Sequence, residues 1–180
     1  ISSAELQELL NANTASVKIL DSSYALPNSG LNPKENWAKE RIANAAFFDI
    51  DAAADHASPL PHMLPTPEAF ADYVSALGIS NGDLVVVYDQ TGIAMAASRV
   101  WWMFRVFGHD NVRVLDGGLP RWKKDDLPVS SAPFTPPQAG SFKASPHLAL
   151  VKSKQDVSNC INSKDTVIID ARAADRFAGK

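Results

Sequence analysis

The feature that most constrains the fold is a continuous apolar run, Leu84 to Tyr88, which ends in a carboxylate at Asp89. A run without polar alternation is typical of a strand buried on both faces, as in parallel sheets. A polar loop containing Gly92 follows, and then a long helical pattern over 93–107 begins. Because open α/β sheets bind ligands at the carboxyl ends of their strands, Asp89 stands where a functional group would lie.

Helix and strand patterns alternate on both sides of this run. Ser3 and Thr66 stand where they can cap helices, and weak helical character extends over 32–42. Strands that alternate with helices favour an α/β fold with a mainly parallel central sheet flanked by helices. The sequence predicts helices over 4–12, 67–77, 93–107 and 119–124, and strands over 17–20, 46–48, 84–88 and 112–115.

The charge of the chain bears on its partners. The 180 residues carry a net charge of −3, which argues against nucleic-acid binding because phosphate contacts need clustered Lys and Arg. No apolar run approaches the roughly 20 residues that span a membrane, and no targeting segment is visible near the start. We therefore expect no nucleic acid, no membrane and a cytoplasmic location, with a mitochondrial one as the alternative.

Two distant segments, 3–22 and 153–171, share one pattern. Each reads as a short helix, a polar turn, a β-branched strand and then an Asp, which is Asp21 in the first and Asp170 in the second. Such self-similarity indicates a duplicated domain. Residues 128–146 hold five of the twelve prolines and little apolar periodicity, as expected of a stiff linker. We predict an N-terminal domain over 1–127, a proline-rich linker over 128–147 and the start of a second copy over 148–180.

The position of Asp89 allows two interpretations. A strand end followed by a glycine loop and a helix gathers backbone N–H groups, which stabilise a thiolate or an oxyanion. A carboxylate is already negative at neutral pH and is a poor acceptor of sulfur. We therefore expect Asp89 to cap the loop by accepting its N–H groups.

Asp51 and His62 are candidates for proton transfer. The strand over 46–48 runs into Asp49-Ile-Asp51, and His62 follows Asp51 by eleven residues in a proline-rich loop. A histidine beside a carboxylate can relay a proton, whereas a lone loop histidine is usually a bystander. A strand that ends in Asp-x-Asp also occurs in phosphatases with an aspartyl nucleophile and Mg²⁺, but their further acidic and lysine partners do not stand out here.

Three residues of the last segment carry reactive groups. Arg172 and Arg176 could together grip a carboxylate or a sulfonate, or could form a surface ion pair with Asp175. The single cysteine, Cys160, rules out an internal disulfide and a CxxC metal site. We expect Cys160 to be a small apolar residue of its helix, because no electropositive group nearby would activate it.

Four segments resemble, in the same order, the two-domain rhodanese-type sulfurtransferases: FFDIDAAADHASPLPHMLP, VVVYDQTG, ASRVWWMFRVFGHDNVRVLDGGLPRW and DARAADRF. The sequence departs from that family at RIANA (41–45), where His-Ile-Pro-Gly-Ala is usual, and at Tyr24, where Trp is frequent. The resemblance implies two rhodanese domains, of which only the second carries the catalytic cysteine. An Asp commonly occupies the nucleophile position of the first domain, so Asp89 is expected to mark a vacated site.

The resemblance also implies roles for residues on either side of the loop. The His62 segment is more similar to the 3-mercaptopyruvate sulfurtransferases than to the thiosulfate enzymes. In those enzymes the residues matching Asp51 and His62 form a proton relay with a serine of the nucleophile loop, and the residue matching Arg176 binds the substrate carboxylate. The offset of 149 residues between the repeats places the nucleophile near position 238, so we expect this chain alone to be inactive.

The reaction that follows from the resemblance moves sulfur from 3-mercaptopyruvate, through a cysteine persulfide, to cyanide or a thiol. The thiol acceptor would be a small thiol or a thioredoxin-like protein, and no metal or other cofactor is needed. Two alternatives stay open at this point. One is a thiosulfate sulfurtransferase, and the other is a catalytically silent rhodanese module used for binding or regulation.

Overall fold

The computed structural model describes residues 1–12, 16–26 and 29–180. These residues form two compact units, Ile1–His147 (unit 1) and Leu148–Lys180 (unit 2). Unit 1 contains a central sheet with helices on both faces, whereas unit 2 consists of short helices joined by irregular chain. The polar turn expected near 13–16 lies mainly outside the described residues.

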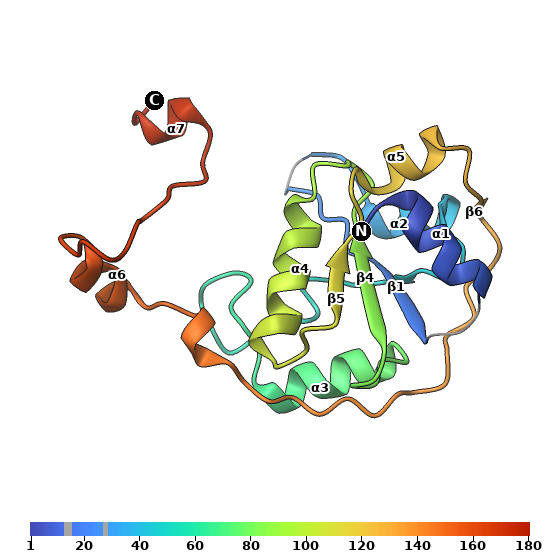
Figure 1. Cartoon of the computed structure of the whole chain (residues 1–180), viewed down its shortest axis with the longest axis horizontal. Helices are drawn as coiled ribbons and strands as arrows, with labels where there is room; N and C mark the ends of the chain where they lie inside the picture. The colour runs from blue at the N-terminus through green and yellow to red at the C-terminus, as the bar shows by residue number, and fades with distance from the viewer. Residues whose placement is uncertain (13–15, 27–28) are drawn as a thin grey trace. The chain divides into compact units, whose positions relative to one another are not determined.

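Within the described residues, the central sheet of unit 1 has four strands in the order β3-β1-β4-β5, all parallel. They are β1 (Val17–Asp21), β3 (Ala46–Phe47), β4 (Leu84–Tyr88) and β5 (Val112–Val114). The predicted α/β class with a parallel sheet is therefore confirmed. β1 and β4 pair in register from Val17 with Leu84 to Asp21 with Tyr88, so both strands end at the same edge (Figure 1).

Five helices surround this sheet in the described part of unit 1: α1 (Ser3–Ala12), α2 (Pro33–Lys39), α3 (Pro67–Ala76), α4 (Met95–Val106) and α5 (Gly118–Lys124). Thr66 caps α3 as predicted, because its side chain accepts the N–H of Ala69. Other details differ from expectation. Ser2 rather than Ser3 caps α1, because the Ser2 hydroxyl accepts the N–H of Glu5 at 3.2 Å. α2 ends before a short strand, β2 (Arg41–Ile42), and α4 begins only after Ala94, whose φ of 59° is left-handed.

The two faces of the sheet bury separate apolar clusters because successive strand residues point to opposite sides. Val85 and Val87 of β4 face α3 and α4, whereas Val86 and Tyr88 face α1 and α5. The largest partners of these residues are Phe70 and Phe104 on the first face, and Leu6 and Trp122 on the second. Both faces of β4 are therefore covered, which agrees with its unbroken apolar sequence.

Residues 128–147, expected as a linker without structural elements, instead lie along unit 1, and we call them the strap. The strap begins with β6 (Val129–Ser130), which pairs antiparallel with β2. Further along, the N–H of Gly140 donates to the carbonyl of Ser75 at 2.8 Å, and the N–H of His147 donates to that of Val106 at 2.7 Å. Figure 1 shows this orange trace following the outside of unit 1. Backbone hydrogen bonds and the burial of one side chain, Phe142 against Phe70 and Phe104, hold the strap in place. Neither leaves an apolar period in the sequence.

Unit 2 contains a 3₁₀ turn (Leu148–Leu150), α6 (Lys154–Cys160) and α7 (Ala174–Phe177). Ser153 and Asp156 form a capping box at the start of α6. The strand expected over 166–169 does not form in the structure. Its side chains stay in solvent, with Val167 at 83% and Ile169 at 81% exposure. A strand needs neighbouring strands for its backbone groups, and the described residues of unit 2 supply none.

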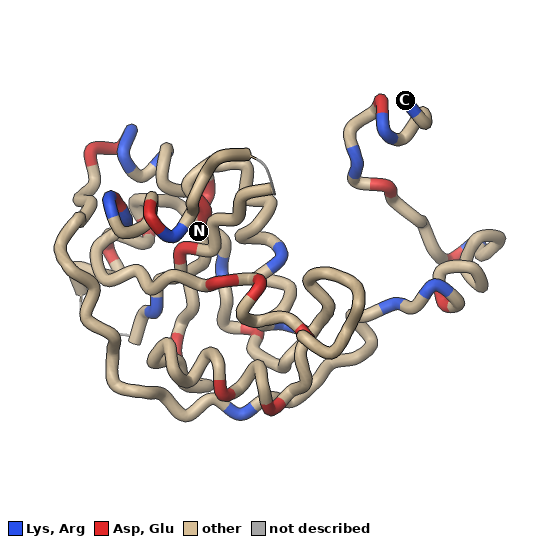
Figure 2. Tube along the Cα trace, turned by 180° about the vertical axis from the view of Figure 1, so that it is seen from behind, with Lys and Arg blue, Asp and Glu red and all other residues tan. Residues whose placement is uncertain are grey.

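Charged side chains are distributed over unit 1 with both signs mixed. On the face drawn in Figure 2, Lys and Arg are interspersed with Asp and Glu. Some of them pair, as Lys123 does with Glu40 at 2.6 Å. None of the helices formed by the described residues is both long and apolar enough to cross a membrane.

Candidate functional site

Asp51 and His62 lie in contact in unit 1. Nδ1 of His62 is 3.0 Å from Oδ1 of Asp51, and the side chains are 34% exposed for His62 and 67% exposed for Asp51. The imidazole Nδ1 is itself buried and is not aligned for a full hydrogen bond, so the contact is a close electrostatic approach. This geometry agrees with the prediction from the sequence that Asp51 and His62 lie close together.

Asp51 is positioned by a turn that follows β3. Oδ1 of Asp49 accepts the N–H of Asp51 at 3.0 Å and that of Ala52 at 3.1 Å, which closes the turn on its own side chain. The hydroxyl of Tyr73, on α3, accepts the N–H of Asp49 at 2.8 Å. Burial raises the pKa of Tyr73 to about 12, so its hydroxyl stays protonated. The turn that carries Asp51 is therefore anchored to α3.

His62 is held from α4. Its backbone is left-handed, with φ at 57°, a conformation that side-chain-bearing residues seldom adopt without support. Nη2 of Arg99 donates to the carbonyl of His62 at 2.5 Å, and the Arg99 guanidinium stacks on the ring of Trp102, 4.7 Å from its centroid. Burial lowers the pKa of Arg99. Sequence reasoning missed this contact, although the spacing of Arg99 and Trp102 on one helix face offered a signal.

Tyr24 is the third side chain at this site. It follows the end of β1, and its hydroxyl lies 3.4 Å from Nε2 of His62. The two rings meet edge to face, with centroids 5.2 Å apart and an interplanar angle of 86°. Three segments of unit 1 therefore bring an acid and a phenol to the two ring nitrogens of one imidazole. The sequence marked Tyr24 only as a departure from the family pattern.

Asp89 caps the loop that follows β4, as predicted. Its Oδ1 accepts the N–H of Thr91 at 3.1 Å and that of Gly92 at 2.8 Å, together with the Thr91 hydroxyl at 2.8 Å. Asp89 is only 2% exposed. Loop amides that would stabilise an external anion are therefore occupied by the chain's own carboxylate.

A buried carboxylate ties the end of β1 to the same loop. Asp21 accepts the N–H and the hydroxyl of Ser23 at 3.0 and 2.5 Å, and the side-chain amide of Gln90 at 2.9 Å. Burial raises the pKa of Asp21, and the hydrogen bonds from Ser23 and Gln90 oppose that shift. This network, which sequence reasoning missed, ties the loop after β4 to the end of β1.

The candidate residues of unit 2 lie at its surface. Arg172 binds Asp170, with Nη2 2.6 Å from Oδ2. Arg176 is exposed on α7, and among the described residues it forms no ion pair, with Asp175 or otherwise. Cys160 is partly buried at the end of α6.

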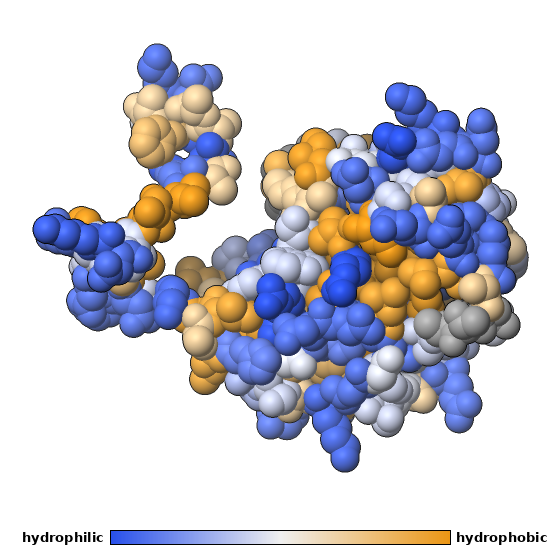
Figure 3. Space-filling view, in the orientation of Figure 1, coloured by the Kyte–Doolittle hydropathy of each residue, from blue (hydrophilic) through white to orange (hydrophobic). Residues whose placement is uncertain are grey.

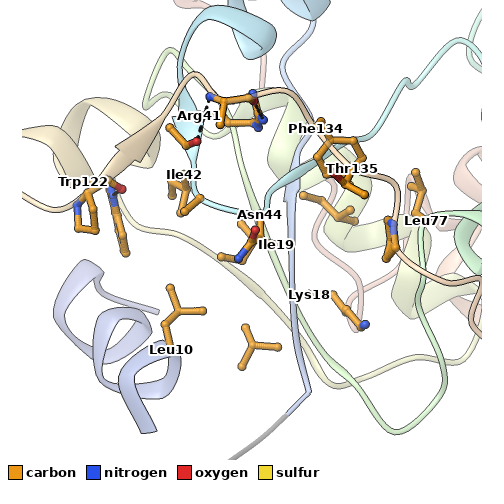
Figure 4. Close-up of a pocket in the computed structure, with 18 of the residues that line it drawn as sticks. Leu10, Lys18, Ile19, Arg41, Ile42, Asn44, Leu77, Trp122, Phe134 and Thr135 are labelled. Carbon is orange, nitrogen blue, oxygen red and sulfur yellow. Dashed lines mark hydrogen bonds between the residues drawn. The ribbon is translucent and has the colours of Figure 1, made fainter. Parts of the chain in front are cut away.

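A cavity of about 610 Å³ lies elsewhere in unit 1, between α1, β1, β2 and the strap. Figure 4 shows Leu10 and Trp122 on one side of it and Phe134 with Thr135 on the other. Neither Asp51 nor His62 lines this cavity, so we place the candidate site at the sheet edge rather than there. Within the described ranges, no three His, Cys, Asp or Glu side chains are arranged to hold a metal ion.

Apolar side chains border the candidate site in sequence and are exposed. Leu60 and Met63 flank His62, and Ile93 and Met95 follow the Asp89 loop, with exposures between 44% and 78%. Figure 3 shows apolar surface on unit 1 near the start of α4. Exposed apolar side chains therefore adjoin His62 and the Asp89 loop in sequence.

The known proteins to which this chain is similar include two kinds of sulfurtransferase. Over 182 residues the chain is 40% identical to the 3-mercaptopyruvate sulfurtransferase of Rattus norvegicus, covering 99% of this chain and 61% of that protein. It is 43% identical over 164 residues to the thiosulfate sulfurtransferase of Bos taurus, covering 91% of this chain and 54% of that protein. The chain thus spans between 54% and 61% of the length of these curated relatives.

A solved structure shows the same architecture. The crystal structure of SseA from Escherichia coli, described as a 3-mercaptopyruvate sulfotransferase with the rhodanese fold, matches with a TM-score of 0.88 and 36% identity. The match covers 98% of this chain and 66% of that one. Residues 2–125 match the rhodanese-like domain family. Since those residues contain the whole central sheet and all the helices packed on it, this chain belongs to the rhodanese-like domain family.

Proposed function

We propose that this chain is the N-terminal part of a sulfurtransferase that takes sulfur from 3-mercaptopyruvate. The observation that carries the choice of donor is the approach of Asp51 to His62 at 3.0 Å. It is supported by 40% identity to a 3-mercaptopyruvate sulfurtransferase over nearly all of this chain. In this proposal residues 1–127 are the non-catalytic domain, 128–147 join the domains, and 148–180 begin the catalytic one.

The proposed chemistry explains why this donor needs a proton relay. A cysteine thiolate attacks the sulfur of 3-mercaptopyruvate, the S–S bond of a persulfide forms, and the carbon–sulfur bond breaks. The electron pair of the broken bond goes to carbon, so pyruvate leaves as its enolate and must gain a proton. The persulfide then passes its outer sulfur to cyanide, to a small thiol or to a thioredoxin-like protein.

Each candidate residue has one role in this scheme. His62, oriented by Asp51, helps to move the proton that the enolate requires. Arg176 binds the substrate carboxylate through its guanidinium. The nucleophilic cysteine belongs to the part of the second domain that follows residue 180, and Asp89 occupies the equivalent place in the first.

A thiosulfate donor is the second candidate, because the thiosulfate sulfurtransferase of Bos taurus is 43% identical over 164 residues. The two donors differ in their leaving groups. Thiosulfate releases sulfite, a stable anion that needs no proton in order to leave, whereas an enolate is a much poorer leaving group. The dependence of each reaction on His62 therefore separates the two candidates.

The test compares His62→Gln and Asp51→Asn in the longer protein, with cyanide as acceptor and thiocyanate as the product measured. Loss of the relay is expected to lower kcat for 3-mercaptopyruvate by about 10²-fold or more, the lower end of general acid–base effects. With thiosulfate, kcat is expected to change much less. Equal losses with both donors, or a wild-type protein that turns over thiosulfate alone, would contradict the proposal.

Residues 1–180 by themselves are expected to give no turnover with either donor. Cys160→Ser is the matched control in the longer protein, because Cys160 has no part in the proposed mechanism. Its rates should equal those of the wild type. Turnover by residues 1–180, abolished by Cys160→Ser, would show that the nucleophile has been assigned wrongly.

A further inference from the structure

The contacts of His62 determine more than its position. A neutral imidazole has one N–H donor and one acceptor nitrogen, and its two neighbours decide which nitrogen is which. The carboxylate of Asp51 only accepts hydrogen bonds, and it lies 3.0 Å from Nδ1. The pair is not aligned for a full hydrogen bond, but a bare Nδ1 lone pair would be repelled by the carboxylate at this distance. The proton of neutral His62 is therefore favoured on Nδ1, which leaves Nε2 as the acceptor.

Tyr24 supplies the group that faces this acceptor. Its hydroxyl is 3.4 Å from Nε2, a long contact whose donor depends on the tautomer of His62: with the proton on Nδ1, the phenol donates and Nε2 accepts. The edge-to-face packing of the two rings, at 86°, holds the imidazole plane in that direction. Because a phenol is a better donor than acceptor, Tyr24 favours the same tautomer at Nε2 that Asp51 favours at Nδ1.

The other charged group near His62 does not oppose this arrangement. Arg99 donates to the backbone carbonyl of His62, and it stacks on Trp102 of its own helix. In the described part of the chain, the groups recorded in contact with the imidazole itself are therefore Asp51 from the turn after β3 and Tyr24 from the segment after β1.

We propose that Tyr24 is a positioning residue that keeps neutral His62 in the Nδ1–H tautomer, with Nε2 as the nitrogen that takes up and releases the proton. The catalytic consequence of this inference rests on the proposed function, but the tautomer itself does not. The observation that carries it is that Asp51 contacts Nδ1 of His62 while Tyr24 contacts Nε2 of the same ring.

The decisive measurement is the tautomer of His62 by NMR in the 180-residue chain labelled with ¹⁵N-histidine. His62→Gln identifies its signals among those of the four histidines. At a pH where His62 is neutral, the wild type is expected to show a proton on Nδ1. Tyr24→Phe keeps the ring and removes only the hydroxyl, and it should shift the population towards the Nε2–H form.

The matched control is Tyr88→Phe, which removes a hydroxyl that accepts the N–H of Ile42 and contacts neither Asp51 nor His62. It should leave the His62 tautomer unchanged. A wild-type His62 that is protonated on Nε2 would overturn the proposal even if Tyr24→Phe failed to fold. An equal tautomer ratio in the wild type and in folded Tyr24→Phe would overturn it as well.

A kinetic measurement in the longer protein separates this inference from the proposed function. With 3-mercaptopyruvate, Tyr24→Phe should lower kcat more than it changes KM, and it should displace the pH profile of kcat. The loss should be smaller than the roughly 10²-fold expected for His62→Gln. A tautomer shift without any kinetic effect would support the positioning role and contradict the proton relay, whereas an unchanged tautomer would contradict the role of Tyr24 alone.

Discussion

The same sequence pattern occurs twice in this chain and has two different outcomes. In unit 1 the pattern forms α1 and then β1, whose Leu20 is only 1% exposed. In unit 2 it forms α6 but no strand, and Ile169 before the second Asp is 81% exposed. β1 is paired on both sides, with β3 and with β4.

The difference separates local from non-local causes of structure. A helix forms its hydrogen bonds within itself, and a capping box such as that of Ser153 strengthens its start. A strand forms its hydrogen bonds with other strands, so its β-branched sequence is not enough without them. Matched substitutions in the two copies should therefore have very different effects.

The largest difference in lost stability is expected between Leu20→Ala and Ile169→Ala, the residues directly before Asp21 and Asp170 in the two copies. Truncating a fully buried leucine leaves a cavity and should lower the free energy of unfolding by about 2–5 kcal/mol. The same truncation at the exposed Ile169 should change it by less than about 0.5 kcal/mol. Urea unfolding followed by tryptophan fluorescence measures the loss in unit 1, where all four tryptophans lie, and amide hydrogen exchange of residues 166–170 measures it in unit 2. A comparable loss from Ile169→Ala would show that the second segment is paired after all.

A smaller difference in the free energy of unfolding is expected between Gly118→Ala and Gly179→Ala. Both glycines have a left-handed backbone, with φ at 54° and 77° respectively. A Cβ on Gly118 would stand 2.4 Å from the carbonyl oxygen of Asp89, whereas one on Gly179 would meet nothing within 4 Å. Gly118→Ala should destabilise unit 1 by about 1–3 kcal/mol. Gly179→Ala carries only the strain of a left-handed alanine, roughly 1–2 kcal/mol, and that strain falls in unit 2, so the unfolding curve of unit 1 should not change. Equal curves for both variants would mean that the loop around Asp89 shifts without cost.

The smallest expected effect concerns pH and His109, which is 3% exposed between Phe104 and Phe142. Burial lowers the pKa of His109 from its ordinary 6.5, and the carboxylates of Asp83 and Asp110 oppose this only in part. The unfolded chain therefore binds a proton at His109 at a higher pH than the folded protein does. The stability that neutral, buried His109 contributes is fully present above about pH 6.5 and is lost as the pH falls through the lowered pKa.

His109→Phe should weaken that loss of stability between pH 7.5 and pH 5 in unit 1. The helicity of unit 2 should not follow this titration, since all four histidines lie in unit 1. Unfolding in urea at several pH values provides the measurement. If the stability of the wild type and of His109→Phe depended on pH in the same way, His109 would not be the group that causes the loss.

Much of the fold of unit 1 could be predicted from apolar periodicity. The run at 84–88 and the helical pattern that follows it specify β4 and α4, because both elements are covered by the core. The short strands β2 and β6 could not be predicted in the same way. They have two residues each and depend on each other's backbone, which leaves no periodic pattern.

The site was only partly predictable for a similar reason. Asp51 and His62 are close in sequence, and the resemblance to a family linked them before any geometry was known. Arg99 and Tyr24 reach His62 across 37 and 38 residues respectively. Contacts of this kind depend on how the sheet aligns its strand ends, so a linear pattern does not contain them.

The strap has a consequence for how molecules of this chain meet one another. An unpaired strand edge aggregates because its free N–H and carbonyl groups attract another strand. Directly after β6, three of the five residues at 133–137 are prolines and have no N–H to offer. The β2–β6 ribbon therefore ends in a segment that is a poor template for an incoming strand, which protects this side of unit 1 from edge-to-edge association.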